Sequence, residues 1–334
     1  MPRIGIFPLL YVSAATAAAL TLCSCGGGGG SQVASVPPPP ATPMPTPTPT
    51  PTPSAPLPPA QLGLVSSAPF AVLGVGETYS TDASGNDPKS IAGPSAQDVQ
   101  FSYDAASGSY SISLPGFQAG RLTNPGYNGS AGQVATSTTN GVSVGSSSTL
   151  QPLNVWLPVP GSDVSPYTYT SFGTWSGQTG VTTGGGVLRA EGIFAYGIPT
   201  QAGDVPVTGT ANYTAEVRGS IGPTWMDWLS GTANLSFGFG AGNLSGSLHA
   251  GVFDNFDGIV MDFGKYDFTQ TVYSTGSTTF SGKFVVPGMP DADSSFSGQF
   301  TGPGAAELMA RFQAPYLFNG QQGTMSGIWI GKKN

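Results

Sequence analysis

From residue 61 onward, apolar and small polar residues alternate in short stretches. Examples are Val99–Tyr103, Tyr110–Leu114 and Leu153–Leu157. Alternation with a period of two is typical of strands that bury one face and expose the other. Turn sequences such as Ala105–Gly108 and Asn124–Gly126 separate these stretches. The pattern therefore predicts an all-β fold.

A Pro-rich stretch, 158–166, interrupts the alternation and predicts a domain boundary. We expect a small β-rich domain over 61–162 and a second domain over 163–334. Evenly spaced strands with Gly-rich turns favour a closed antiparallel barrel or a sandwich in the second domain. Its candidate strands are 167–175, 187–197, 208–218, 231–239, 244–252, 258–269, 278–286, 294–301, 305–313 and 323–331.

Composition supports this fold class. The 334 residues include 50 Gly and 31 Pro, which disfavour helix interiors. With 39% apolar residues, a wholly disordered chain is not expected. The formal net charge is −7, and Lys and Arg do not cluster, which argues against a nucleic-acid partner.

The first residues resemble a secretory signal. Arg3 precedes an apolar run, Ile4–Leu22, and the sequence Leu22-Cys23-Ser24-Cys25 resembles the lipobox of bacterial lipoproteins. The resemblance implies a signal peptide over 1–24 and acylation of Cys25, which would anchor the protein in a membrane. A retained transmembrane helix or an ordinary signal peptide are the alternatives. No Cys follows residue 25, so neither a disulfide nor a Cys-based metal site is expected.

Residues 25–60 predict a disordered linker. Gly26–Gly30 is followed by a Pro/Thr tract over Pro37–Pro59. Such a tract favours polyproline II, which rises by about 3.1 Å per residue and would extend this one to roughly 70 Å. Anchor and linker together predict a tether that holds the folded part away from a membrane.

Three stretches of the second domain resemble the barrel domain of transferrin-binding protein B and its relatives, the surface lipoproteins of Gram-negative bacteria. They are Phe194–Gly197 with Thr200, then Pro206–Tyr213, then Gly298–Leu308 with Phe312. In the last two, Ala215 stands where the family pattern has Gly, and Met309-Ala310 stand where it has Gly-Gly. The motif residues to which the resemblance gives a structural role are Gly197, Pro206, Gly209, Thr210, Tyr213, Gly302, Pro303 and Glu307.

The resemblance implies a β-rich handle-like domain followed by an eight-stranded antiparallel barrel. It further implies an outer-membrane surface location, a protein ligand that carries iron or haem, and an outer-membrane transporter as partner. Glu307 is a carboxylate in an apolar stretch. It is expected to accept hydrogen bonds from the backbone of the preceding turn, with ligand binding as the alternative.

Residues that carry catalytic or metal chemistry are scarce. His249 is the only His, and its stretch places it on the strand face opposite Leu248, exposed or held by a hydrogen bond. No Gly-x-Ser-x-Gly elbow that leads from a strand to a helix supports a serine-type triad with it, so an enzyme is not predicted. An acidic run comprises Asp254, Asp257, Asp262 and Asp267. Its spacings do not match those of an EF-hand, so it predicts a solvated strand face rather than a calcium site. No cofactor is expected.

The most apolar connection between strands contains Trp225 and Trp228. Because Trp is favoured in protein interfaces, this connection is a candidate ligand-contact loop; the alternative is a short helix that plugs the barrel end. We therefore expect a lipid-anchored surface protein that binds a protein ligand with its loops for nutrient acquisition. A structural or adhesive surface lipoprotein without a role in uptake is the second hypothesis.

Overall fold

The computed structural model describes residues 68–84, 86, 88–106, 109–117, 120–123, 135–138, 154–158, 165–222, 228–254 and 258–334. The predicted signal peptide, Cys25 and the linker lie outside these residues. Residues 55–334 belong to one compact unit. Within the described ranges, no helix has the length and hydropathy needed to cross a bilayer.

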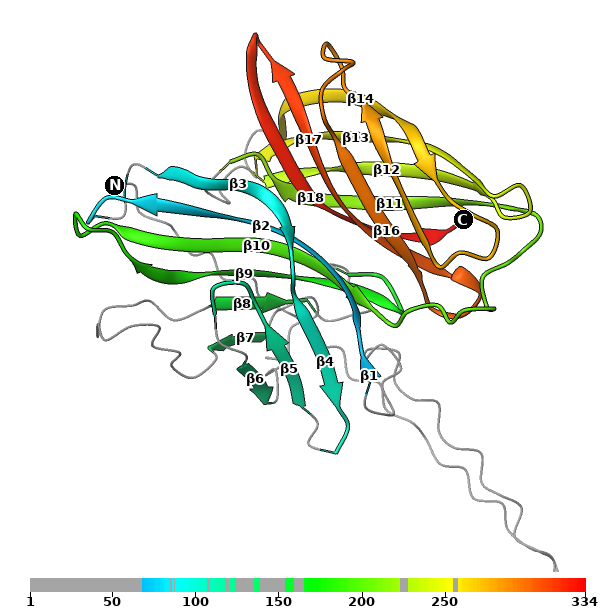
Figure 1. Ribbon diagram of the computed structural model, residues 1–334, viewed down its shortest axis with the longest axis horizontal. Helices are drawn as coiled ribbons and strands as arrows, with labels where there is room; N and C mark the ends of the chain where they lie inside the picture. The colour runs from blue at the N-terminus through cyan, green and yellow to red at the C-terminus, as the bar shows by residue number, and fades with distance from the viewer. Residues whose placement is uncertain are drawn as a thin grey trace, which may run out of the picture. The chain divides into compact units, whose positions relative to one another are not determined.

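The described residues form two open sheets and a closed barrel (Figure 1). In the order of its strands, the small sheet contains β1 (Ala68–Pro69), β4 (Gln100–Asp104), β5 (Ser109–Ser113) and β6 (Gly120–Thr123). The six-stranded sheet contains β3 (Lys89–Gln97), β2 (Ala71–Thr81), β10 (Val187–Gly197), β9 (Thr170–Val181), β8 (Asn154–Leu157) and β7 (Ala135–Thr138).

Eight consecutive antiparallel strands close the barrel, which confirms the predicted fold class. A 3₁₀ turn, η1 (Pro303–Ala305), joins β16 to β17. The strands are β11 (Thr210–Ser220), β12 (Trp228–Gly238), β13 (Asn243–Asp254), β14 (Gly258–Val272), β15 (Thr279–Val285), β16 (Ser295–Thr301), β17 (Glu307–Phe318) and β18 (Gln321–Lys333).

Two of the ten candidate strands are not part of the barrel, although the sequence placed everything after residue 163 in the barrel domain. Strands β9 and β10 belong to the six-stranded sheet, where β10 pairs with β2 from Val187 opposite Thr81 to Gly197 opposite Ala71. The barrel itself begins at Thr210. Because β2 lies more than a hundred residues earlier, the local alternation could not reveal this pairing.

Strand β10 lies between two cores, and its residues are buried from Ala190 to the end of the strand. The ring of Phe194 packs edge-to-face against that of Phe101 in the small sheet. The alternate residue Ile193 packs with Ile328 on the outer wall of β18. The six-stranded sheet therefore forms a layer that the small sheet covers on one face and the barrel on the other.

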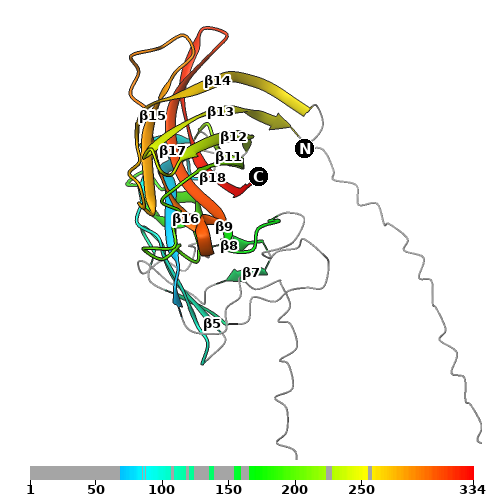
Figure 2. The same cartoon turned by 90° about the vertical axis from the view of Figure 1, so that its right-hand side faces the viewer.

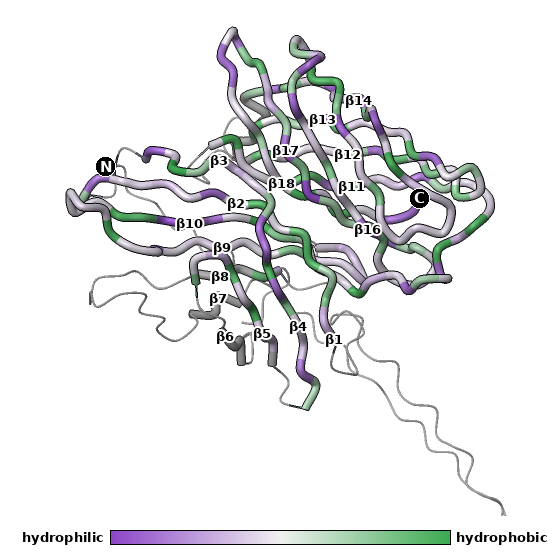
Figure 3. The backbone as a smooth tube through the Cα atoms, in the orientation of Figure 1, coloured by the Kyte–Doolittle hydropathy of each residue, from purple (hydrophilic) through white to green (hydrophobic). Residues whose placement is uncertain are grey.

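Large aromatic side chains fill the barrel. Phe237 and Phe300 lie 4.8 Å apart between ring centroids, and Phe312 stacks on Trp329 at 5.6 Å. On β11 and β12, inward apolar residues alternate with polar ones that face outward, whereas β17 and β18 are also buried on their outer face by the six-stranded sheet. Hydropathy changes accordingly along the chain (Figure 3). The interior is thus a packed core, as expected for a small barrel.

Two acidic residues are buried side by side in the six-stranded sheet. Glu77 and Glu191 are register partners on β2 and β10, with exposed fractions of 7% and 5%. Tyr79 donates a hydrogen bond to Oε2 of Glu191 at 3.1 Å. Burial raises the pKa of Glu77 to about 7, because the charged carboxylate loses its hydration.

This pKa predicts a pH-dependent stability. A carboxyl whose pKa is raised by folding stabilises the fold below its unfolded pKa, and this contribution is lost as the pH rises through about 7. We expect the melting temperature to fall between pH 5 and pH 8, and Glu77→Gln to flatten that fall. Thermal unfolding followed by circular dichroism measures both, with the exposed Asp98→Asn as control. An equally steep fall in Glu77→Gln would contradict the assignment.

Candidate functional site

Glu307 connects the barrel to the segment that enters β9. One carboxylate oxygen accepts the backbone N–H of Thr168 at 2.7 Å, and the other accepts that of Tyr169 at 2.9 Å. The predicted backbone acceptor role is therefore observed, but the donors belong to a segment 138 residues earlier rather than to the preceding turn. Both oxygens are occupied and the residue is 5% exposed, so it does not offer a free ligand.

Further hydrogen bonds join the same elements, and we call this region the joint; it comprises residues 167–170, 197–200 and 300–307. Thr200 Oγ1 donates to the Gly302 carbonyl at 2.7 Å, and the Gly302 N–H donates to Ile198 at 2.9 Å. Gly302 has a φ of 71°, and a Cβ there would lie 2.4 Å from the Tyr169 ring. Glycine is required at this position by both conformation and space.

The motif residues of the sequence analysis gather at or near the joint. Tyr213 points into the barrel, where its hydroxyl donates to the Ala305 carbonyl at 2.5 Å. Gly209, with a φ of 77°, precedes Thr210 at the start of β11, and its carbonyl accepts the N–H of Phe239 at 2.9 Å. Of the remaining motif residues, Pro206 is half-buried before β11, Gly197 ends β10 and Pro303 starts η1.

The two departures from the family pattern are accommodated by their neighbours. Ala215 lies opposite Gly331 across the β11–β18 pair, so its methyl group meets a partner without a side chain. Met309 is fully buried on the outer wall of β17, where it packs with Ile328 and Val75. The methionine thus adds to the contact between the barrel and the six-stranded sheet.

Four connections meet at the end of the barrel to which the candidate Trp loop belongs. Trp225 lies outside the described residues, and of Trp228 the structure describes only the backbone at the start of β12. The β11–β12 connection shares this end with the β13–β14, β15–β16 and β17–β18 connections, because the strands alternate in direction. The strand order therefore assigns the predicted loop to the same end of the barrel as these connections.

We call five apolar residues of the β15–β16 and β17–β18 connections and the adjoining strand ends the rim: Val285, Met289, Tyr316, Leu317 and Phe318. Leu317 is 43% exposed and Val285 is 45% exposed. Tyr316 stacks on Phe263 at 4.4 Å, and a Cβ on Gly288 would lie 3.2 Å from Leu317, so the β15–β16 and β17–β18 connections are in contact. The rim is therefore built on packed, ordered connections.

Sequence reasoning missed the rim, although one signal was available. Tyr316, Leu317 and Phe318 are consecutive apolar residues, and a strand points successive side chains to opposite faces. One of the three must then face solvent. The Asn319-Gly320 turn that follows, with both residues at positive φ, ends the strand and exposes its tip.

His249, Asp262 and Asp267 lie on the outside of the barrel. As predicted, Leu248 is buried and His249 points outward, with its side chain 60% exposed. Its Nε2 lies 2.8 Å from Oδ1 of Asp262. The Gly264 N–H and then His249 lower the pKa of Asp262. Asp267 pairs with Lys265, Asp254 ends β13, and Asp257 lies outside the described residues.

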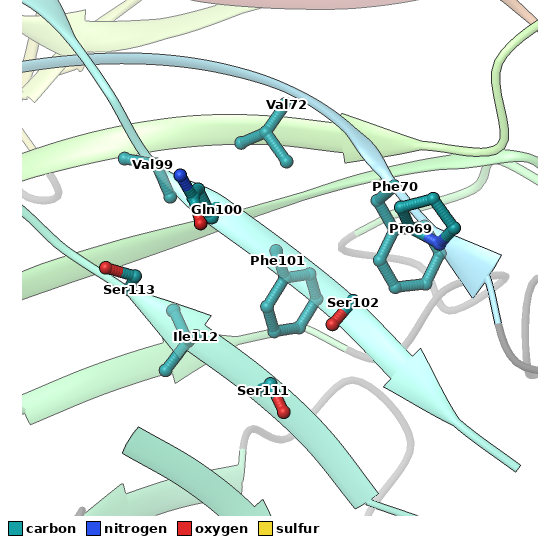
Figure 4. A pocket seen from close by; sticks show the side chains of 10 residues that line it. All are labelled: Pro69, Phe70, Val72, Val99, Gln100, Phe101, Ser102, Ser111, Ile112 and Ser113. Atoms are coloured by element: carbon teal, nitrogen blue, oxygen red, sulfur yellow. The ribbon is translucent and has the colours of Figure 1, made fainter. Parts of the chain in front are cut away.

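No group of three metal-ligating side chains occurs within the described ranges. A groove of about 430 Å³ lies on the small sheet, beside the point where β1 joins β2 (Figure 4). Its polar residues come from cross-strand pairs, Gln100 with Ser113 and Ser102 with Ser111. The groove contains no titratable side chain, so it offers hydrogen bonds but no acid or base.

Neither a known protein family nor a curated protein matches the sequence. Among solved structures, a double mutant of transferrin-binding protein B from Haemophilus parasuis Hp5 is 18% identical, with a TM-score of 0.41, over 74% of this chain and 46% of that chain. Isotype 1 of that protein from serogroup B Neisseria meningitidis is 17% identical, with a TM-score of 0.38, over 78% of this chain and 43% of that chain. The chain spans about half the length of these proteins, and the likeness concerns the fold.

The Glu307 contacts predict that the substitution of a single atom group, Glu307→Gln, lowers the stability of the fold. In Glu307→Gln the amide NH₂ would face one of the two backbone N–H donors, leaving that donor buried without an acceptor. We expect a loss of about 1–3 kcal/mol of unfolding free energy. Urea denaturation measures it, and Asp291→Asn, at an exposed acid between β15 and β16, is the control. A loss no larger than that of the control would show that the two hydrogen bonds contribute little.

Proposed function

We propose that this protein is a lipid-anchored protein of the bacterial outer membrane that presents its barrel at the cell surface and captures a protein ligand with the rim. The lipobox-like sequence at Cys25 and the Pro/Thr tract support the tether. The joint supports the presentation, since hydrogen bonds of the buried residues Glu307 and Thr200 fix the barrel to the six-stranded sheet.

The exposed apolar rim is the observation that carries the proposed capture. Leu317 and Val285 expose apolar surface next to Met289, on connections that pack against one another. Aromatic and Met side chains are enriched in protein interfaces, whereas charged ones are depleted from interface centres. Next to the rim, Lys283 and Asp293 form an ion pair with 3.0 Å between Nζ and Oδ1. Charged side chains of this kind are typical of the polar margin of a protein interface.

The packed interior favours a macromolecular ligand over a small one. Phe237, Phe280 and Phe300 lie in mutual contact inside the barrel at the end opposite the rim, with centroids 4.8 to 5.5 Å apart. Nearer the rim, the rings of Phe268 and Trp329 pack on Phe296 with centroids at 4.6 and 5.4 Å. A barrel that carries a small molecule needs an interior space in this position. A ligand of this barrel therefore binds outside it.

We infer an iron- or haem-carrying protein as the ligand class, with an outer-membrane transporter as the next partner. The motif stretches Phe194–Gly197, Pro206–Tyr213 and Gly298–Leu308, which resemble those of transferrin-binding protein B, support this class. The ligand is then held at the surface until the transporter receives its iron or haem.

Lipid anchoring predicts that Cys25→Ala releases the protein from the membrane fraction, because the acylated side chain is lost. Cys23→Ala should stay in that fraction, since Cys23 would be removed with the signal peptide. Fractionation of cells and immunoblotting measure both variants. Membrane association of Cys25→Ala equal to that of the unchanged protein would contradict the anchor.

Capture by the rim predicts that Val285→Ser combined with Leu317→Ser weakens binding by about tenfold or more, because each substitution removes apolar contact area. Val272→Ser is the matched control, since Val272 is 63% exposed at the opposite end of the barrel. Biolayer interferometry with iron-loaded transferrins and haemoglobins measures the affinities.

The outcomes separate the two hypotheses of the sequence. Binding that only the rim variant loses supports capture for nutrient acquisition. If none of these carriers binds the unchanged protein, the acquisition role is contradicted and the adhesive or structural role gains support. Equal binding by the rim variant and the control would place the contact elsewhere on the protein.

A further inference from the structure

Polar side chains form ordered rows across the outer wall of the barrel, on a face that the rim and the joint do not use. Strands β11 to β14 lie side by side (Figure 2). Register brings Asn212 opposite Ser236, which in turn lies opposite Ser245. The next row contains Thr214, Asn234, Ser247 and Asp267. The local sequence shows none of these juxtapositions.

The side chains of these rows point outward. Asn212, Asn234 and Ser236 are exposed, whereas the residues between them, Tyr213 and Leu235, are buried in the barrel core. Since a strand alternates its faces, the carboxamide and hydroxyl groups lie on one continuous surface. We call this surface the polar wall; it comprises Asn212, Thr214, Asn234, Ser236, Ser245 and Ser247.

Most of the polar wall is free to bind. Within the described ranges, no hydrogen bond engages the side chains of Asn212, Asn234, Ser236 and Ser247. Each carboxamide offers two donors and an acceptor, and each hydroxyl offers one donor and two acceptor lone pairs. Thr214 differs, because its hydroxyl donates to Asn334 Oδ1 at 3.1 Å.

The wall has a depression that is lined by residues of both rows. A depression of about 470 Å³ is lined by Asn212, Asn234, Ser236 and Ser247, together with Lys265 and Asp267. The last two pair with each other at 2.7 Å. The lining is therefore rich in hydrogen-bonding groups, and its charged side chains compensate each other.

We propose that the polar wall binds a neutral polyhydroxylated chain, a polysaccharide. A ligand with many hydroxyl groups matches a surface whose free groups both donate and accept, and the lining favours neither sign of charge. The spacing agrees as well: neighbouring strands lie about 4.8 Å apart, which is close to the length of one pyranose unit. A sugar chain laid across the strands would meet a new polar group at each unit.

The proposal predicts saturable binding of neutral oligosaccharides by the full-length protein. Maltohexaose, cellohexaose and N-acetylchitohexaose are the probes, and calorimetry measures their affinities. We expect the double variant with Asn212→Ala and Asn234→Ala to bind the probe about tenfold or more weakly. The reason is that each lost side chain leaves sugar hydroxyl groups without a hydrogen-bond partner. Asn243→Ala is the matched control, because Asn243 is exposed on β13 but does not line the depression.

Salt and mass measurements complete the test. Binding through neutral groups should be equal at low and high salt, whereas binding of a heparin hexasaccharide that falls with salt would indicate an electrostatic site at Lys265 and overturn the proposal. Failure of all three neutral probes to bind, or equal affinity in the double variant, would overturn it too. Self-association by light scattering that the double variant loses would assign the wall to a second copy instead.

Discussion

The two hydrogen bonds that Glu307 accepts are the interaction on which the architecture depends. A buried carboxylate loses its hydration, and it is tolerated because the backbone N–H groups of Thr168 and Tyr169 replace the lost water. These residues immediately precede β9, so the same contact that satisfies the carboxylate sets where the six-stranded sheet meets the barrel. The left-handed backbone of Gly302, pressed against the Tyr169 ring, permits no side chain in this contact.

The position of the joint explains why β10 is buried on both faces. Strand β10 leaves it with one face toward the small sheet and the other toward β17 and β18, which explains its continuous burial. The barrel is closed, so it has no free edge, and aromatic side chains fill its interior from the end opposite the rim to Phe268, Phe296 and Trp329. The surfaces left for recognition are the ends of the strands and the outer wall. The rim and the polar wall occupy these two positions, and they differ in chemistry as expected for different partners.

Much of the fold was readable from alternation alone. All ten candidate strands after residue 163 correspond to observed strands, because a half-buried strand must alternate and each turn needs Gly, Asn or Pro. The division of these strands between the barrel and the six-stranded sheet could not be predicted, because β10 pairs with β2, which lies more than a hundred residues earlier. The candidate site was predicted in part. The Trp-bearing connection joins β11 to β12 at the barrel end that carries the rim. Leu317 and Val285 were missed, because exposure at a strand tip depends on which neighbouring connections cover it.

The sequence by itself determined the all-β class, the strand positions, the Gly-rich turns between strands, and the inward and outward faces of residues such as Leu248 and His249. These properties are local: side-chain periodicity and glycine conformation act over a few residues. Tertiary structure alone decided which N–H groups Glu307 accepts, which strands share a sheet, and which polar residues form one wall. The physical reason is that each of these is a pairing between distant segments, chosen by the closure of the barrel and the burial of the joint as a whole.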